Sequence, residues 1–150
     1  MARLARLVAG MLVAWGLVLA PPAMAQQGED ADALNAQVIK LYGEGKYTDA
    51  IPLAKRVLTI REKALGPDHP DVGTALNNLA ALYQAQGRYT EAEPLYKRSL
   101  EIREKALGPD HPDVGQSLNN LAELYRAQGR YADSEPLYKR SLGIDRKSVV

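Results

Sequence analysis

Apolar residues recur along this chain with the spacing of one face of a helix. Leu76, Leu79, Ala80 and Tyr83 lie three and four positions apart, so an α-helix would place them on one side. Similar segments follow one another, separated by short stretches that contain glycine or proline, and no alternating strand pattern competes. The predicted helices cover residues 31–43, 48–65, 70–86, 90–107, 112–128 and 132–146.

The helical pattern is repeated at a spacing of 42 residues. The stretch 65–73, with the sequence LGPDHPDVG, returns unchanged at 107–115. Alignment of residues 61–102 with 103–144 leaves only eight differences. Repeats of this length are typical of helical arrays in which each unit packs on its neighbours.

An earlier segment is a diverged third copy of the repeat. The stretch 45–53 parallels 87–95, and Tyr42 is aligned with Tyr83. The spacing from Tyr42 to Tyr47 is then one residue shorter than the spacing from Tyr83 to Tyr89. This difference predicts a shortened turn in the first copy. The predicted units are 31–65, 66–107 and 108–146, followed by a tail at 147–150.

Residues at fixed places in these units resemble the tetratricopeptide repeat family. The matching residues are Leu79, Ala80, Tyr83, Gly87, Tyr89, Ala92 and Tyr96, with Leu121, Ala122, Tyr125, Gly129, Tyr131, Ser134 and Tyr138 in the next copy. The usual repeat has 34 residues. The longer repeat found here, with its Leu-Asn-Asn-Leu-Ala motif, is similar to the kinesin light chain type, which is abundant in bacterial proteins. The resemblance implies an all-α solenoid of three antiparallel helix pairs in a right-handed superhelix.

Residues 1–25 have the three-part order of a secretory signal peptide. Two arginines precede an uncharged, mostly apolar run over 7–20, and small residues allow cleavage between Ala25 and Gln26. The run is shorter than the ~20 residues that span a bilayer, which favours cleavage over a retained anchor. We therefore expect an exported, periplasmic protein with a flexible linker at 26–30; secretion, or anchoring by an uncleaved signal, is less favoured.

The composition argues against several classes of function. The net charge is +1, which is too balanced to indicate a nucleic acid or acidic membrane partner. The chain has no cysteine, so it has no disulfide, thiol nucleophile or zinc–thiolate site.

The repeated Asp-His-Pro-Asp motif at 68–71 and 110–113 is the strongest candidate for chemistry. His69 with its two acidic neighbours is compatible with a metal or general-base site. The same residues suit a helix entrance, with a capping side chain and a proline in the first turn. We favour the helix entrance, because a catalytic site needs different groups at one point and the copies repeat the same groups. We therefore expect no catalytic residue, metal site or cofactor.

Polar residues beside the buried stripe are the better candidates for binding. In the family that the chain resembles, the first helix of each pair lines the concave surface. An asparagine amide both donates and accepts, which suits the backbone of an extended peptide. Asn77 and Asn119 are expected in this groove, whereas Asn78 and Asn120 either line it or bond between helix pairs. The candidate peptide-binding residues are Lys40, Asn77, Asn78, Gln84, Asn119, Asn120, Glu123 and Arg126.

Differences between the two close copies concentrate near this stripe. Four of the eight lie on or beside it, at 74/116, 75/117, 81/123 and 84/126. This is the pattern expected if the scaffold is fixed while a recognition surface varies. In the first copy, the alignment on Tyr42 puts the pair Ala36-Gln37 in the place of the two asparagines.

The sequence predicts a non-enzymatic scaffold of the cell envelope that binds a peptide segment of a partner protein. One alternative is the recognition arm of a larger secreted enzyme, such as a caspase-like protease, or of an assembly complex, since bacterial arrays of this type are often joined to other domains. A third is a self-associating module, because Leu137, Leu142 and Ile144 in the last helix have little to cover them.

Overall fold

The computed structural model describes residues 23–148, with side chains from 31 to 147. The helices are α1 (Ala23–Gly43), α2 (Tyr47–Leu65), α3 (Pro70–Ala85), α4 (Tyr89–Leu107), α5 (Pro112–Ala127) and α6 (Tyr131–Ser148). The described part of the chain contains no strand. None of its helices is both long and apolar enough to cross a membrane.

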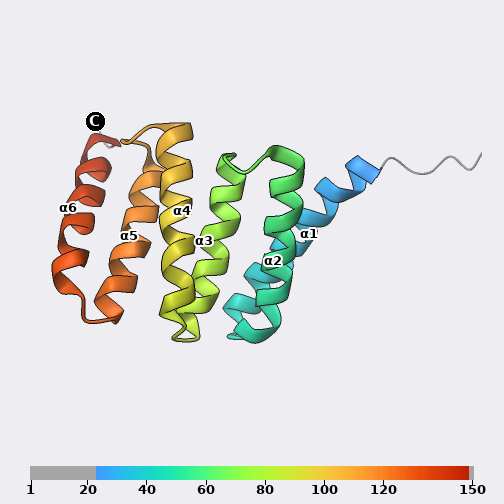
Figure 1. The fold of residues 1–150 in the computed structure, drawn as a ribbon, viewed down its shortest axis with the longest axis horizontal. Coiled ribbons are helices and arrows are strands. Elements are labelled where there is room, and N and C mark those ends of the chain that lie inside the picture. The colour runs from blue at the N-terminus through green and yellow to red at the C-terminus, as the bar shows by residue number, and fades with distance from the viewer. Residues whose placement is uncertain (1–22, 149–150) are drawn as a thin grey trace, which may run out of the picture.

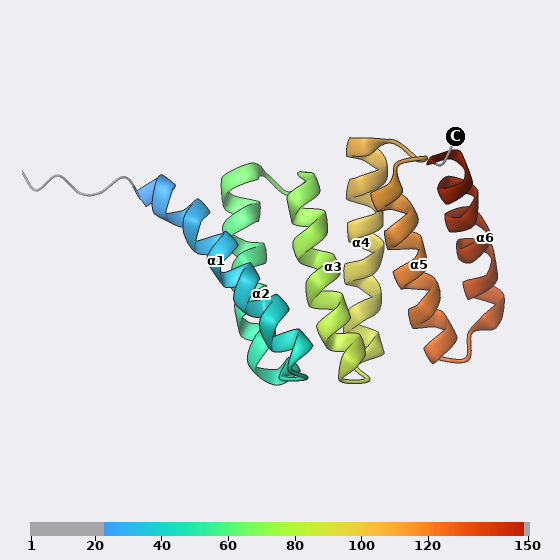
Figure 2. The same cartoon turned by 180° about the vertical axis from the view of Figure 1, so that it is seen from behind.

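The helices stand side by side in chain order, with α1 and α6 at opposite ends of the array (Figures 1 and 2). Contacts are densest within the pairs α1–α2, α3–α4 and α5–α6, and the pairs join through α2–α3 and α4–α5. Short turns make neighbouring helices antiparallel. The predicted all-α solenoid of three helix pairs is confirmed.

The first helix begins earlier than the sequence pattern predicts. α1 starts at Ala23, so the segment 26–30, predicted as a flexible linker, is helical. The segment begins with two glutamines and is flanked by alanines, and these residues favour a helix, while Gly28 costs about 1 kcal/mol. At the other end, residues 147–148 of the predicted tail belong to α6. The predicted signal peptide lies outside the described residues, apart from its last three positions.

The Asp-His-Pro-Asp motif is the entrance to α3 and again to α5. Nδ1 of His69 accepts a hydrogen bond from the backbone N–H of Asp71 at 3.1 Å, and Pro70 occupies the first turn. His111 caps α5 in the same way. No group of three or more potential metal ligands gathers among the described residues.

The turn of the first copy is not shortened, which corrects the prediction made from Tyr42. The backbone N–H of Lys46 donates to the carbonyl of Leu41, as that of Arg88 donates to the carbonyl of Tyr83. Leu41 therefore takes the place of Tyr83, and the 42-residue register holds throughout. Tyr42 corresponds to Gln84, and Asn35 rather than Ala36 corresponds to Asn77.

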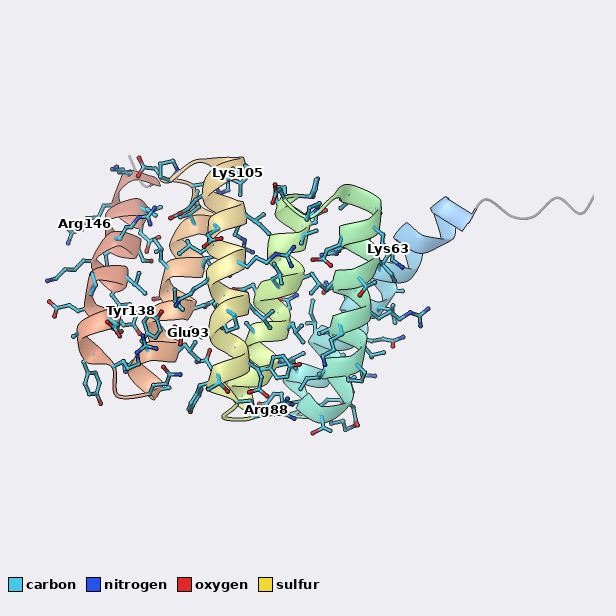
Figure 3. All side chains as sticks on the ribbon, viewed as in Figure 1. Lys63, Arg88, Glu93, Lys105, Tyr138 and Arg146 are labelled. Atoms are coloured by element: carbon cyan, nitrogen blue, oxygen red, sulfur yellow. The ribbon has the colours of Figure 1, made fainter. Side chains whose placement is uncertain are left out.

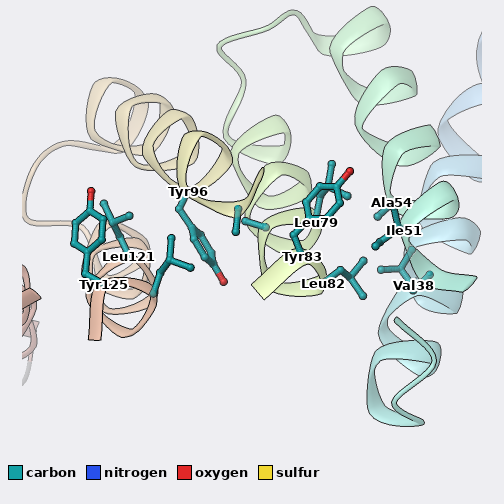
Figure 4. Close-up of a cluster of buried hydrophobic side chains, with 13 residues drawn as sticks. Val38, Ile51, Ala54, Leu79, Leu82, Tyr83, Tyr96, Leu121 and Tyr125 are labelled. Carbon is teal, nitrogen blue, oxygen red and sulfur yellow. The ribbon is translucent and has the colours of Figure 1, made fainter. Parts of the chain in front are cut away.

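A continuous apolar core runs along the array (Figure 4). It includes Val38, Ile51, Leu82, Tyr96 and Leu121, which come from α1 to α5, and all of them are buried. Each helix pair thus buries its apolar stripe against the next pair as well as within itself. Such stacking explains how units too small to hold a core alone are stabilised.

Arginines of the second helices tie each pair to the one that follows. Arg103 of α4 is buried and donates to the Asp113 carbonyl at 3.1 Å and to Oγ of Ser117 at 2.9 Å. Arg61 of α2 donates to the Asp71 carbonyl at 3.3 Å, which is the equivalent bond one repeat earlier. These bonds fix the start of each first helix on the preceding pair.

Candidate functional site

Three adjoining hollows form one groove along α1, α3 and α5. The first, of about 130 Å³, is lined by Val38, Ile39, Tyr42, Asn78, Ala81 and Leu82. The second, of about 420 Å³, is lined by Tyr42, Ala81, Gln84, Ala85, Tyr89, Tyr96, Asn120, Glu123 and Ala127. The third, of about 370 Å³, is lined by Gln84, Glu123, Arg126, Ala127 and Tyr131. Because neighbouring hollows share residues, we treat them as one surface, called the groove below.

The asparagines form hydrogen bonds between repeats. Nδ2 of Asn120 donates to Oδ1 of Asn77 at 2.9 Å, and Nδ2 of Asn78 donates to Oδ1 of Asn35 at 3.2 Å. Asn78 and Asn120 also line the groove, so both roles considered for them from the sequence coexist.

Asn77 does not lie in the groove, and the prediction that it is exposed there is wrong. Its exposed fraction is 8%, and its Oδ1 accepts the hydrogen bond from Asn120 of α5. Asn77 therefore serves as an acceptor between repeats.

Lys40 lies outside the groove, whereas Asn119 lies next to it. Asn119 is exposed and lines a hollow between α5 and α6 that shares Glu123 and Arg126 with the third hollow of the groove. Lys40 takes the place of Leu82 in the 42-residue register, on the side of α1 that faces away from α3. Leu82 is buried against the preceding pair, whereas Lys40 is exposed. The position of Lys40 follows from the direction in which the repeats stack.

The remaining predicted residues, Gln84, Glu123 and Arg126, do line the groove. Oε1 of Gln84 accepts a hydrogen bond from the Tyr96 hydroxyl at 2.9 Å. Burial raises the pKa of that hydroxyl far above its ordinary value, so Tyr96 is a neutral donor.

Glu123 is held from two sides. It pairs with Arg126 at 2.9 Å and accepts a hydrogen bond from the Tyr138 hydroxyl. The pKa of the Tyr138 hydroxyl is raised, mainly by burial and secondly by its hydrogen bond to Glu123. The polar groups of the groove are therefore oriented before any ligand arrives.

Sequence reasoning missed the apolar end of the groove. Ile39 and Tyr42 on α1 are 60% and 44% exposed and line the first hollow with Ala81. The signal was available, because aligning the turn glycines Gly45 and Gly87 places Tyr42 at Gln84 and Ile39 at Ala81. Both of those positions already belonged to the predicted stripe.

The comparisons with known proteins agree with this geometry. A family model described as tetratricopeptide repeat matches residues 29–104 and 71–147. The putative kinesin light chain repeats of Podospora anserina are 25% identical, with a TM-score of 0.70, and the match covers 85% of this chain and 59% of that one. BtubC of P. vanneervenii is 24% identical, with a TM-score of 0.73, and the match covers 83% of this chain and 52% of that one.

A third solved structure, the tetratricopeptide repeat domain of Arabidopsis FLU, is 16% identical with a TM-score of 0.72, and the match covers 81% of this chain and 98% of that domain. BtubC and the FLU domain support the fold alone. The chain spans between 52% and 59% of the BtubC and Podospora chains. The family match covers most of the chain, and the similarity to kinesin light chain repeats agrees with the long repeat. The chain belongs to the tetratricopeptide repeat family.

Proposed function

We propose that this protein is a scaffold of the cell envelope that binds an extended peptide segment of a partner protein in the groove. Repeats of this family typically mediate protein–protein interactions without catalysis. The observation that carries the finer proposal is the combination of an apolar hollow at Ile39, Tyr42 and Ala81 with oriented polar groups beside it. The first would accept an apolar side chain, and the second would bind the peptide backbone.

The amides of Asn78 and Asn120 are suited to that backbone. Each donates to the preceding first helix through Nδ2, while its Oδ1 makes no hydrogen bond to the described residues. A carbonyl oxygen fixed in this way is a ready acceptor for a peptide N–H. The two amides lie one repeat apart, so an extended segment running along the groove would meet both.

Export rests on the sequence of residues 1–25. We infer that the chain is delivered to the periplasm and cleaved before Gln26. Fractionation of expressing cells followed by N-terminal sequencing tests this point. A periplasmic protein that begins at Gln26 is expected, and a cytoplasmic protein that keeps Met1 would refute it.

Photocrosslinking at Ile39 tests the groove. A photoreactive residue at this position, in the full chain expressed in its host, should link to a partner protein, whereas the same residue at exposed Arg56 on α2 should not. Ala81→Glu should abolish the link, because a carboxylate would enter the apolar hollow. This change suits the fold, since the third repeat carries Glu123 at the same place. Ala64→Glu, on the exposed side of α2, is the matched control. Equal linking in all variants would refute the groove assignment.

A further inference from the structure

The last helix pair has a face that no other described element covers. We call it the outer face, formed by Asn119 of α5 and by Glu135, Tyr138, Lys139, Leu142, Asp145 and Arg146 of α6. It contains a hollow of about 590 Å³. Leu142, at the centre of the outer face, is 55% exposed. Arg146 extends away from the molecule (Figure 3).

The same face of the earlier pairs receives the next repeat through two charged positions. The first is the arginine of each second helix, Arg61 or Arg103, which donates to a carbonyl at the start of the following first helix. The residue after it is a glutamate that pairs with an arginine of the following second helix. Glu62 pairs with Arg98 at 2.7 Å, and Glu104 pairs with Arg140 at 2.5 Å.

In the last pair the charges at these two positions are reversed. Asp145 stands where Arg61 and Arg103 stand, and Arg146 stands where the glutamates stand. A further repeat of the same type would bring its carbonyl toward the Asp145 carboxylate and its arginine toward Arg146. Both contacts are repulsive.

A second copy stacked head to tail meets the same obstacles. Its α2 carries Arg56 at the place of Arg98, opposite Arg146. Its α1 offers Ala36 and Lys40 where α3 offers Asn78 and Leu82, so it supplies neither the amide donor nor the buried leucine. The outer face therefore does not suit the end of the array that begins with α1.

We propose instead that two copies pack outer face to outer face, with their α6 helices antiparallel and a twofold axis at Leu142. In such a pair, a residue three positions before Leu142 faces the residue three positions after it on the other copy. Lys139, which also pairs with Glu135 of its own helix at 2.5 Å, then faces Asp145 of the second copy, twice over. Four positions from Leu142 on either side, Arg146 of one copy faces the Tyr138 ring of the other. This arrangement favours a cation–π contact.

The equivalent helix of the second repeat shows that this complementarity is specific to α6. The same crossing about Leu100 of α4 would oppose Lys97 to Arg103, two positive charges. Thus the change from Arg103 to Asp145 turns a self-repelling helix face into a self-complementary one. The leucine at the centre of the crossing is the same in both helices.

Exchange of charges tests the pairing in the full chain. Sedimentation of the purified protein should show a dimer. Lys139→Glu and Asp145→Lys should each raise its dissociation constant by about tenfold, because two attractive pairs become repulsive. An equimolar mixture of the two variants should recover the parental value, because each variant then supplies the charge that the other lacks. A monomeric parent, or a mixture as weak as the single variants, would overturn the proposal.

A cysteine at the twofold axis provides an independent measurement, because the chain has no cysteine of its own. Leu142→Cys should form a disulfide between copies under mild oxidation, since residues on the axis come within bonding range. Leu65→Cys, which replaces an exposed leucine at the end of α2, should not. A disulfide between differently tagged Leu142→Cys and Lys40→Cys chains, without self-linking of Leu142→Cys, would indicate head-to-tail stacking and overturn the proposal.

Discussion

At the scale of single residues, two histidines serve as helix caps. His69 and His111 present Nδ1 as an acceptor to the backbone N–H two positions on, at 3.1 Å in both cases. This role requires the neutral ring with its proton on Nε2. The acidic neighbours Asp71 and Asp113 lie in the first turn, where the helix dipole favours negative charge.

Replacement of the cap tests this role. His69→Ala should lower the free energy of unfolding by about 1 kcal/mol, because the N–H of Asp71 loses its acceptor. His69→Asn should retain most of the stability, since asparagine is a good cap. Urea unfolding followed by circular dichroism measures both. If the two variants lose the same stability, the imidazole has another role.

The asparagines offer a matched pair of substitutions. Asn77→Ala should lower the free energy of unfolding by about 1–2 kcal/mol, because it removes the acceptor of the half-buried Asn120 amide. Asn119→Ala changes the same residue type at the same place in the repeat, but on the outer face, and should change stability by less than about 0.5 kcal/mol. Thermal and urea unfolding below the concentration of any self-association would distinguish them. Equal losses would contradict the role of Asn77.

At the scale of single elements, α6 is the helix with most room for improvement. Gly143 lies inside it, where the second repeat has Glu101, and no atom outside the local helix lies within 4 Å of an added Cβ. Gly143→Ala should therefore raise the free energy of unfolding by about 0.5–1 kcal/mol. Gly115→Ala in α5 is the control, because its Cβ would lie 3.4 Å from Ile144 and gain less. Differential scanning calorimetry would show a higher Tm for the first variant only.

The helices themselves were predictable, whereas the register of the first was not. Periodic leucines and the turn residues Gly87 and Pro70 placed five helices to within two residues of their observed ends. Tyr42 misled the alignment of the first copy, because a matching residue type outweighed the turn glycines. Backbone geometry at Gly45, with a φ of 72° like that of Gly87, restores the register.

At the scale of the whole molecule, stability depends on the junctions between helix pairs. Among the described helices, the main contacts lie within each pair and between successive pairs, so the loss of one junction should release one end of the array. Arg103 is the natural point to test, because it is buried and joins α4 to α5. Burial lowers the pKa of its guanidinium, although the Asp113 carboxylate acts in the opposite direction.

Arg103→Ala should weaken the last pair by about 2 kcal/mol, because hydrogen bonds to a charged group are lost. Hydrogen exchange should then show α5 and α6 opening before α1 and α2. Arg98→Ala, which removes a more exposed pair with Glu62, should leave the order of exchange unchanged. Uniform loss of protection across all helices would show that the array unfolds as one unit.

The stacking direction also explains which site residues the sequence predicted. Gln84, Glu123 and Arg126 lie on the open side of their helices, so their periodicity alone placed them in the groove. Asn77 lies toward the following pair, and Lys40 lies on the side of α1 that faces away from α3. The period of one helix does not tell which flank of its apolar stripe the next unit covers, and that depends on the whole array.

Glu123 belongs to two surfaces at once. It lines the groove and, together with Arg126, it also lines the hollow of the outer face, where it accepts a hydrogen bond from the Tyr138 hydroxyl. A peptide that binds this carboxylate from the groove would compete with the Tyr138 hydroxyl and change the surface offered to a second copy. Thermodynamic linkage requires the converse, by the same factor: association of two copies would alter the affinity for the peptide. One shared carboxylate thus gives a short helical array a route to cooperative binding.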